Sequence, residues 1–364
     1  MRRQSKIDMS NDNMPGPADR ARPAALRDTR LKAVAWLCDR VAADGTPVAS
    51  EIGNSWWRAP WALCVGGAPD VAAAMLGWIE RNALTDQGDL RGGPFGGGQP
   101  GSSVYLLSPI AIAAALLARY DLAEAVMDRL ETYQDPITGG AYNSADFRQE
   151  PLQDLLKTAQ LGISALVTGR TAAADGVCSW LKQLYAKQPE LPTKLYTGLR
   201  NGELVTTFGA KEAFVRVVDF SAPKQAYFNP GIAAAFLAGY SQKTGDVDAL
   251  TLGQRYLALN EGGTTDQFDD RSSVQICKFG WGVAAMHTAS PTLDRLHWLN
   301  KMADWFMSRQ ESDGSWAPSS FMTPRPGMLD YFWKTAEHLM EVSYIESALL
   351  QARHRMPQRD VVQR

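Results

Sequence analysis

Charged side chains interrupt several stretches of this sequence that are otherwise apolar, and these are the residues best suited to do chemistry. One stretch carries Asp330, Lys334 and His338 at steps of four residues, with Glu337 beside them. A step of four places side chains on one face of a helix, and an ionised group is rarely buried without a partner or a function. We therefore expect this face to border a cavity.

Other apolar stretches carry charges in the same way. Lys157 lies on a stripe with two glutamines, Lys278 interrupts an apolar run, and Arg58 is flanked by tryptophans. Two interpretations are open. Either these charges form buried ion pairs that fix helix packing, as between Lys334 and Asp330, or Arg58, Lys278 and Lys334 bind the anionic part of a ligand.

A carboxyl group in such a cavity can serve as a general acid, because desolvation raises its pKa and keeps it protonated near neutral pH. We predict Asp269 as the acid, with Asp330 or Glu337 as its partner and Asp154 as a further candidate. Aromatic rings nearby could stabilise a cationic intermediate or stack on a sugar ring. The predicted substrate-binding residues are Trp57, Arg58, Tyr105, Tyr142, Lys157, Tyr227, Asn229, Lys278, Trp316, Tyr331, Lys334 and His338.

Helical periodicity places these residues on six helical hairpins. In each hairpin an amphipathic helix precedes a more apolar one, which indicates a surface helix followed by a buried helix. Six apolar helices inside six amphipathic ones predict an all-α (α/α)6 toroid, although a linear solenoid would show the same pattern. The expected pairs are 30–43 with 56–64, 70–82 with 102–120, 121–133 with 152–168, 171–187 with 230–244, 246–260 with 270–286, and 291–308 with 328–350.

The connections between these helices differ in length according to their direction. Turns from an apolar helix to the next amphipathic one are short, as at 169–170, whereas the loops into the apolar helices are long. Long loops are commonly functional. All six emerge over the N-termini of the inner helices, where partial positive charge favours anionic or polar ligands. We expect the active site at this mouth.

The longest loop, 188–228, carries a structural signal of its own. Asn201–Gly202 separates two alternating segments, which predicts a β-hairpin, and we expect its second arm to pair with 214–220. This hairpin would be a flap over the mouth. The alternative is a surface decoration unrelated to catalysis.

Composition excludes several other classes of protein. The chain of 364 residues has a net charge of −2, which argues against binding nucleic acid through phosphate contacts, and no apolar run approaches the roughly 18 residues of a membrane span. Its four cysteines are too far apart for a zinc cluster or a disulfide framework. We expect a disordered tail at 1–22, a single domain at 23–352, a C-terminal tail at 353–364 and a cytoplasmic location. The oligomeric state is not predicted.

Two segments resemble known toroid families. Residues 304–316 resemble the QW repeat of the squalene-cyclase and oxidosqualene-cyclase superfamily, with Gln310, Gly314 and Trp316 at the spacing of that motif. Residues 92–99 resemble the glycine-rich repeat of protein prenyltransferase β subunits. Because QW-type motifs mainly tie an outer helix to the next loop, these resemblances imply the fold more than the chemistry.

The cyclase resemblance implies protonation of an alkene by the middle aspartate of a D-x-D-D motif. In 267–270 Asp269 occupies the position of that acid, whereas Gln267 replaces the first carboxylate. A helix N-cap is the alternative role for Asp269 or Asp270.

A different resemblance links the chain to carbohydrate enzymes. Residues 135–142 and 229–246 resemble a loop and an inner helix of N-acylglucosamine 2-epimerase-like and six-hairpin glycosidase proteins. The epimerases rely on histidines, one of them where Asn229 stands. Of the four histidines in this chain, His338 alone lies on an inner helix near the expected cavity. Two-histidine epimerase chemistry is therefore not expected.

No cofactor or metal is expected. The glycine-rich run lacks the preceding strand of a dinucleotide-binding fingerprint, the D-x-C string of the prenyltransferase zinc site does not occur, and Cys277 fits a buried structural thiol. We predict a small-molecule enzyme, an isomerase, cyclase or lyase, acting on a largely apolar substrate such as an isoprenoid with a polar or anionic group. The alternatives are a carbohydrate-active epimerase or glycosidase, with two carboxylates about 5–10 Å apart, and a non-catalytic binding scaffold.

Overall fold

Helices of two kinds alternate along the chain in the computed structural model, which describes residues 17–95 and 102–355. The outer helices are amphipathic, as in α5 (Tyr120–Glu131), whereas inner helices such as α4 (Val104–Leu116) are buried on nearly all sides. The other outer helices are α1 (Pro17–Cys38), α3 (Pro69–Asn82), α7 (Thr171–Ala186), α10 (Val247–Glu261) and α13 (Leu293–Arg309). The other inner helices are α2 (Ala59–Gly66), α6 (Leu155–Thr168), α9 (Phe228–Thr244), α12 (Cys277–Ala289) and α14 (Met328–Arg355).

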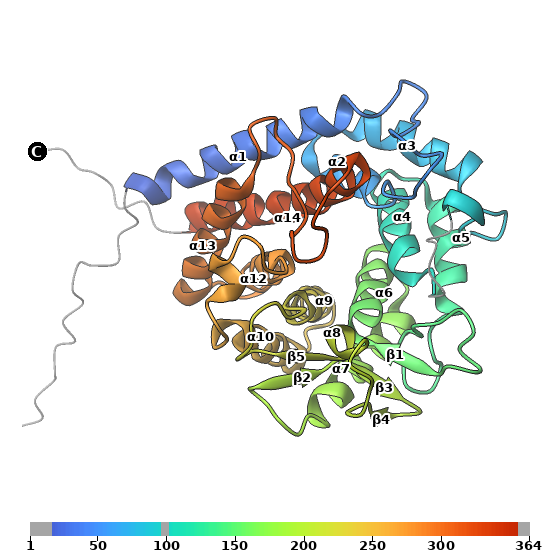
Figure 1. Cartoon of the computed structure of the whole chain (residues 1–364), viewed down its shortest axis with the longest axis vertical. Coiled ribbons are helices and arrows are strands. Elements are labelled where there is room, and N and C mark those ends of the chain that lie inside the picture. The colour runs from blue at the N-terminus through green and yellow to red at the C-terminus, as the bar shows by residue number, and fades with distance from the viewer. Residues whose placement is uncertain (1–16, 96–101, 356–364) are drawn as a thin grey trace, which may run out of the picture.

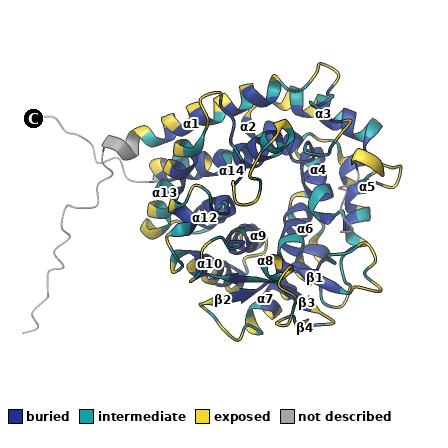
Figure 2. Ribbon diagram, viewed as in Figure 1, coloured by how far each residue is buried: buried dark blue, intermediate teal, exposed yellow. Residues whose placement is uncertain are grey.

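The inner helices form a closed ring. Each packs against the next inner helix along the chain, and α14 packs against α2, so the last and the first inner helices meet. The outer helices surround this ring, and α1 closes the outer layer by contacting α13 and α14 (Figure 1). In Figure 2 the inner helices are mainly buried, whereas exposed residues lie along the outer helices. The predicted (α/α)6 toroid is confirmed, and ring closure excludes the linear solenoid.

A glycine turn that follows an outer helix packs against the neighbouring outer helix of the ring. After α13 the chain turns at Gly314, whose φ of +96° is a conformation that residues with side chains rarely adopt. A Cβ atom at Gly314 would lie 2.6 Å from the backbone oxygen of Lys32, so the turn lies directly against α1. The side chain of Gln310 strengthens the junction by donating hydrogen bonds to the backbone oxygens of Thr29 (2.8 Å) and Gly314 (3.0 Å). The same close approach to the next outer helix occurs at Gly45, Gly88 and Gly139.

Replacing Gly314 by alanine is expected to lower the free energy of unfolding by about 2–3 kcal/mol, because the added Cβ meets backbone atoms of α1 and positive φ is retained. Urea denaturation measures this loss. Gly202→Ala is the matched control, since Gly202 also has a positive φ (+79°) but a Cβ there meets nothing within 4 Å. We expect the control to lose about 1 kcal/mol. Equal losses in the two variants would contradict the role given to the contact with α1.

The predicted β-hairpin lies in the loop between α7 and α9. β3 (Gly198–Arg200) pairs antiparallel with β4 (Glu203–Leu204). The turn residues Asn201 and Gly202 have φ values of +52° and +79°, as a type I′ turn requires. On its other edge β3 pairs with β1 (Leu152–Asp154), which directly precedes α6. The hairpin is thereby attached to the N-terminal end of α6.

One expectation about this loop is wrong. It is β2 (Lys194–Tyr196), in the first arm, that pairs with β5 (Val217–Asp219), and not the second arm. Leu195 and Tyr196 of β2 are buried, whereas β4 is exposed or half-buried. Pairing of β5 with β2 therefore buries apolar side chains, which pairing of β5 with β4 would not do.

Several boundaries differ from those expected. Residues 17–22 belong to α1 rather than to a tail, and α14 continues beyond 352 to Arg355. The fifth inner helix begins at Cys277 rather than near 270, and the short helix α11 (Asp266–Asp269) precedes it. The remaining short elements are η1 (Gly93–Phe95) and α8 (Ala213–Arg216). Residues 1–16, 356–364 and positions 96–99 of the glycine-rich segment lie outside the described residues. Among the helices that are described, none combines the length and apolarity needed to cross a membrane.

Candidate active site

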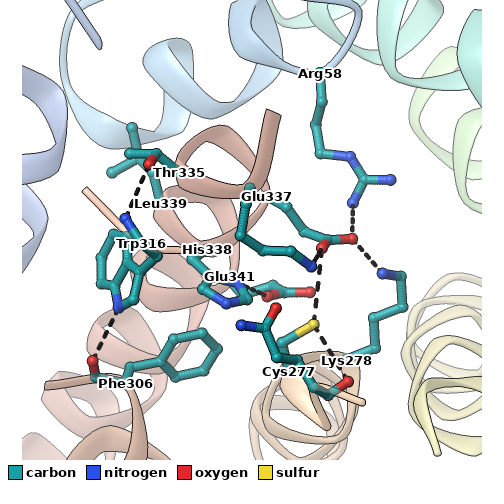
Figure 3. Close-up of polar contacts among 12 residues, drawn as sticks. Arg58, Cys277, Lys278, Phe306, Trp316, Thr335, Glu337, His338, Leu339 and Glu341 are labelled. Atoms are coloured by element: carbon teal, nitrogen blue, oxygen red, sulfur yellow. Dashed lines mark hydrogen bonds and ion pairs between the residues drawn. The ribbon is translucent and has the colours of Figure 1, made fainter. Parts of the chain in front are cut away.

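Charged side chains from three inner helices converge on one carboxylate, that of Glu337 in α14. Arg58, which directly precedes α2, places its Nη1 atom 3.1 Å from Glu337 Oε1, and Lys278 at the start of α12 contacts the same oxygen. Lys334, one turn earlier in α14, places its Nζ atom 2.6 Å from Glu337 Oε2. Figure 3 shows the Glu337 carboxylate between Arg58 and Lys278. These four residues, all predicted site residues, form what we call the central cluster.

The ion pair between Lys334 and Asp330, offered as an example of one of the two interpretations, is not formed. Lys334 pairs with Glu337, three residues further along α14. The side chain of Asp330 instead accepts a hydrogen bond from the backbone N–H of Gly327 (2.9 Å), just before the helix. Asp330 thus bonds to the backbone at the N-terminal end of α14.

The central cluster is buried, with relative exposures of 1% for Arg58 and 2% for Glu337. Burial alone would raise the pKa of Glu337, but Lys278, Lys334 and Arg58 outweigh it and hold that pKa well below its usual value. Burial would lower the pKa of Lys278, but the Glu337 carboxylate outweighs it and raises that pKa above its usual value. Glu337 is therefore ionised and Lys278 protonated at neutral pH.

Glu341, one turn beyond Glu337, is a buried residue that the sequence analysis missed. Burial, with the negative charge of Glu337, raises the pKa of Glu341 to about 8, so this carboxyl group is mostly protonated at neutral pH. Its Oε2 atom lies 3.1 Å from Nδ1 of His338, and its Oε1 atom has no hydrogen-bond partner among the described residues. Burial and the charge of Lys334 lower the pKa of His338, which leaves the imidazole neutral. The spacing of Lys334, Glu337 and Glu341 at i, i+3 and i+7 is the sequence signal that would have included Glu341.

Aromatic rings lie beside each cation of the central cluster. The ring centroids of Trp57 and Tyr105 lie 4.6 and 5.2 Å from the guanidinium carbon of Arg58. The ring centroid of Phe228 lies 5.5 Å from the Nζ atom of Lys278. The ring centroid of Trp333 lies 4.2 Å from the Nζ atom of Lys334. Tyr105, Phe228 and Trp333 are half-buried, so part of each residue remains accessible. The cluster is thus bordered by partly exposed aromatic side chains.

The loop between α13 and α14 reaches over the centre of the ring in Figure 1. It is tied to the segment before α12, because the side-chain nitrogen of Gln275 donates to the backbone oxygen of Ala317 (2.8 Å) and the Phe321 N–H donates to that of Ser272 (3.0 Å). Phe321 itself is exposed.

Three residues of this region could offer ligand atoms to a metal ion, since atoms of Cys277, Glu337 and His338 lie within 4.8 Å of one another. The fit is poor. Glu337 already contacts three cations, which would repel a metal ion. Burial and the charges of Glu341 and Glu337 raise the pKa of the Cys277 thiol well above its usual value, whereas a ligand must be deprotonated. Metal independence stays a prediction.

A second polar group lies at the N-terminal end of α6. Asp154 caps the helix by accepting the backbone N–H of Lys157 (2.9 Å), and the Nζ atom of Lys157 lies 2.9 Å from its other oxygen. Lys157 also contacts the side-chain oxygen of Asn143. Tyr142 donates its hydroxyl to Asp135 (2.5 Å). The predicted residues Asp154, Lys157 and Tyr142 are thus engaged with neighbours of their own loop.

Asp269, the predicted acid, is exposed at the end of α11. The desolvation on which that prediction depended is therefore absent, and its catalytic role stays a prediction. Neither Asp269 nor Asp270 caps the fifth inner helix, which begins at Cys277. Asp270 instead accepts the backbone N–H of Ser272 (2.8 Å) within a turn.

The other predicted binding residues hold local segments. The hydroxyl of Tyr227 donates to the backbone oxygen of Ala222, and the side-chain nitrogen of Asn229 donates to that of Ala226 (3.1 Å). The indole N–H of Trp316 donates to the backbone oxygen of Phe306 (3.0 Å). Tyr331 is half-buried in the first turn of α14. Binding roles for these residues stay predictions.

A surface cavity of about 600 Å³ lies between loop 148–151 and the hairpin turn at 200–201. Arg148, Glu150 and Arg200, which line it, are exposed. The charges there are exposed to water. The buried groups that shift one another's pKa values lie in the central cluster, so we place the candidate site at the cluster.

Comparison with known proteins gives a fold class. No protein family model matches the chain, and no curated protein sequence matches it significantly. Solved structures do match, and they include toroid enzymes named as mannanases and a mannose isomerase.

Three of these structures cover nearly the whole chain. The family 76 α-mannanase of Bacteroides thetaiotaomicron matches with a TM-score of 0.62 and 13% identity, over 90% of this chain and 97% of its own. A D-mannose isomerase matches with a TM-score of 0.65 and 10% identity, over 94% and 100%. An inactive variant of the α-1,6-mannanase of Salegentibacter sp., in complex with α-1,6-mannotriose, matches with a TM-score of 0.56 and 12% identity, over 89% and 99%. At these identities the matches show the shared fold.

Proposed function

We propose that this chain is an enzyme that acts on a carbohydrate by acid–base chemistry at the central cluster, as an isomerase or epimerase. The observation that carries the proposal is the pair Glu337 and Glu341, neighbouring carboxyl groups on α14 of which one is ionised and the other protonated at neutral pH. Environments that drive the pKa values of two carboxyl groups apart suit them to opposite roles. Glu341 would donate a proton and Glu337 would accept one.

The surroundings support a sugar as the substrate. Partly exposed aromatic side chains lie beside the charged groups, and aromatic faces pack well against the C–H face of a sugar ring. Structures that share the fold include a D-mannose isomerase and two mannanases. The predicted isoprenoid chemistry depended on Asp269 as a desolvated acid, and this residue is exposed. The carbohydrate alternative is therefore preferred.

Incubation of the purified protein with D-mannose, D-mannuronate and D-mannose 6-phosphate in D₂O tests the proposal. An isomerase or epimerase is expected to produce a second sugar, with deuterium incorporated at the carbon that loses its proton, as followed by NMR. Glu337→Gln is expected to abolish the conversion. Lys182→Met, which removes an ion pair between α7 and α10 (2.8 Å to Asp246), is the matched control and is expected to retain it.

Hydrolysis is the second candidate reaction, favoured by the mannanases that share the fold. Release of reducing ends from α-1,6-mannooligosaccharides, without deuterium exchange, would replace the isomerase proposal by a glycosidase. Turnover of isoprenoid alcohols or diphosphates, lost in Asp269→Asn, would overturn the carbohydrate proposal. A protein that converts none of these compounds would favour the binding scaffold.

A further inference from the structure

The central cluster holds more positive than negative charge. Arg58, Lys278 and Lys334 contribute three positive charges and Glu337 contributes one negative charge, which leaves a net charge of +2. Glu341 is mostly protonated at neutral pH and would reduce this only to +1 if it were ionised. Buried charge that is not neutralised is unfavourable. The arrangement therefore favours the binding of an anion.

The hydrogen-bonding capacity of the cluster is also unfilled. A guanidinium group has five N–H donors in a planar fork that matches the oxygens of a carboxylate or a phosphate. Of the three nitrogens of Arg58, Nη1 contacts Glu337, whereas Nε and Nη2 are buried without a hydrogen-bond partner in the described part of the chain. In Figure 3 the end of Arg58 and the ammonium group of Lys278 both contact the same oxygen of the Glu337 carboxylate. Both could contact one anion there.

We infer that Arg58, Lys278 and Lys334 bind an anionic oxygen group of the substrate, either the carboxylate of a sugar acid or the phosphate of a sugar phosphate. The anion site is argued from the cluster alone, and the sugar part of this inference rests on the proposed function. Lys278 and Arg58 stand at the N-terminal ends of α12 and α2, where the partial positive charge of the helices adds to the attraction. The half-buried rings of Tyr105, Phe228 and Trp333 would contact the sugar.

Calorimetric titration of the full chain with four probes tests this inference. The probes are D-mannose, D-mannuronate, D-mannose 6-phosphate and inorganic phosphate. We expect one of the two charged sugars to bind at least tenfold more tightly than D-mannose, and this advantage to shrink as the salt concentration rises. The charged sugar that binds more tightly identifies the anionic group as carboxylate or phosphate.

The remaining outcomes separate this inference from the proposed function. Equal affinity for D-mannose and both charged sugars would overturn the anion site and leave the carbohydrate proposal standing. Binding of inorganic phosphate without binding of any sugar would support the anion site and contradict the carbohydrate proposal. Absence of binding by all four probes would overturn the anion site.

Lys278→Met distinguishes an anion site from structural ion pairs. It lowers the net charge of the cluster from +2 to +1 while Arg58 and Lys334 still neutralise Glu337. We expect at least a tenfold loss of affinity for the charged sugar with a Tm equal to or above that of the wild type. Lys182→Met is expected to bind as the wild type does. Wild-type affinity in Lys278→Met would overturn the inference, and Lys334→Met provides the same comparison if the first variant does not fold.

Discussion

Replacing Glu337 by glutamine is expected to lower the free energy of unfolding by about 3–5 kcal/mol, the usual cost of removing one partner from a buried ion pair. The amide carries no charge, so the cations of Arg58, Lys278 and Lys334 would face one another without a counter-ion. Urea denaturation at pH 7 measures the loss. Added phosphate is expected to recover part of it, because an anion bound to the three cations stabilises the folded state.

The double variant Glu337→Gln, Lys278→Met is the control for this experiment. It removes one positive charge together with the negative one, so it is expected to be more stable than Glu337→Gln alone, and the difference measures the energy with which the two residues interact. A loss of less than about 1 kcal/mol in Glu337→Gln would contradict the account of the cluster, because so small a loss is typical of a solvent-exposed ion pair.

Replacing Glu341 by glutamine is expected to leave stability nearly unchanged at pH 5 and to raise it at pH 8–9. The pKa of Glu341 is raised from 4.5 to about 8 in the folded protein, so the unfolded chain releases this proton at lower pH than the folded chain. The associated stability is fully present below pH 4.5 and is lost as the pH rises to about 8. At about 1.4 kcal/mol per pKa unit the loss is on the order of 5 kcal/mol. Glutamine does not titrate, so the variant avoids this loss.

Urea denaturation of both proteins at pH 5, 7 and 9 measures the difference. Glu346→Gln is the control on the same helix: Glu346 pairs with Arg30 (2.6 Å), so its replacement is expected to give no gain at high pH. If Glu341 is also the general acid, Glu341→Gln loses turnover while it gains stability, and wild-type turnover declines as the pH rises through about 8. Equal stability of Glu341→Gln and the wild type at pH 9 would contradict a raised pKa.

Local sequence patterns determined the helices and several members of the site. The alternation of amphipathic and apolar helices follows from which faces need burial, so the six hairpins could be predicted from spacing alone. Asn201–Gly202 specified the hairpin turn, because few residue pairs tolerate positive φ at both positions. Arg58, Lys278 and Lys334 were recognised because a charge within an apolar helix needs a partner or a function.

Only the tertiary structure decided how these residues combine. Arg58 and Glu337 are 279 residues apart in the sequence, and their ion pair exists because ring closure brings α2 against α14. In the folded protein Lys334 pairs with Glu337 rather than with Asp330, Glu341 is buried beside Glu337, and Asp269 is exposed. Protonation depends on burial and on the distances to charges on other helices. Periodicity along one helix shows which residues share a face, but not what lies opposite that face.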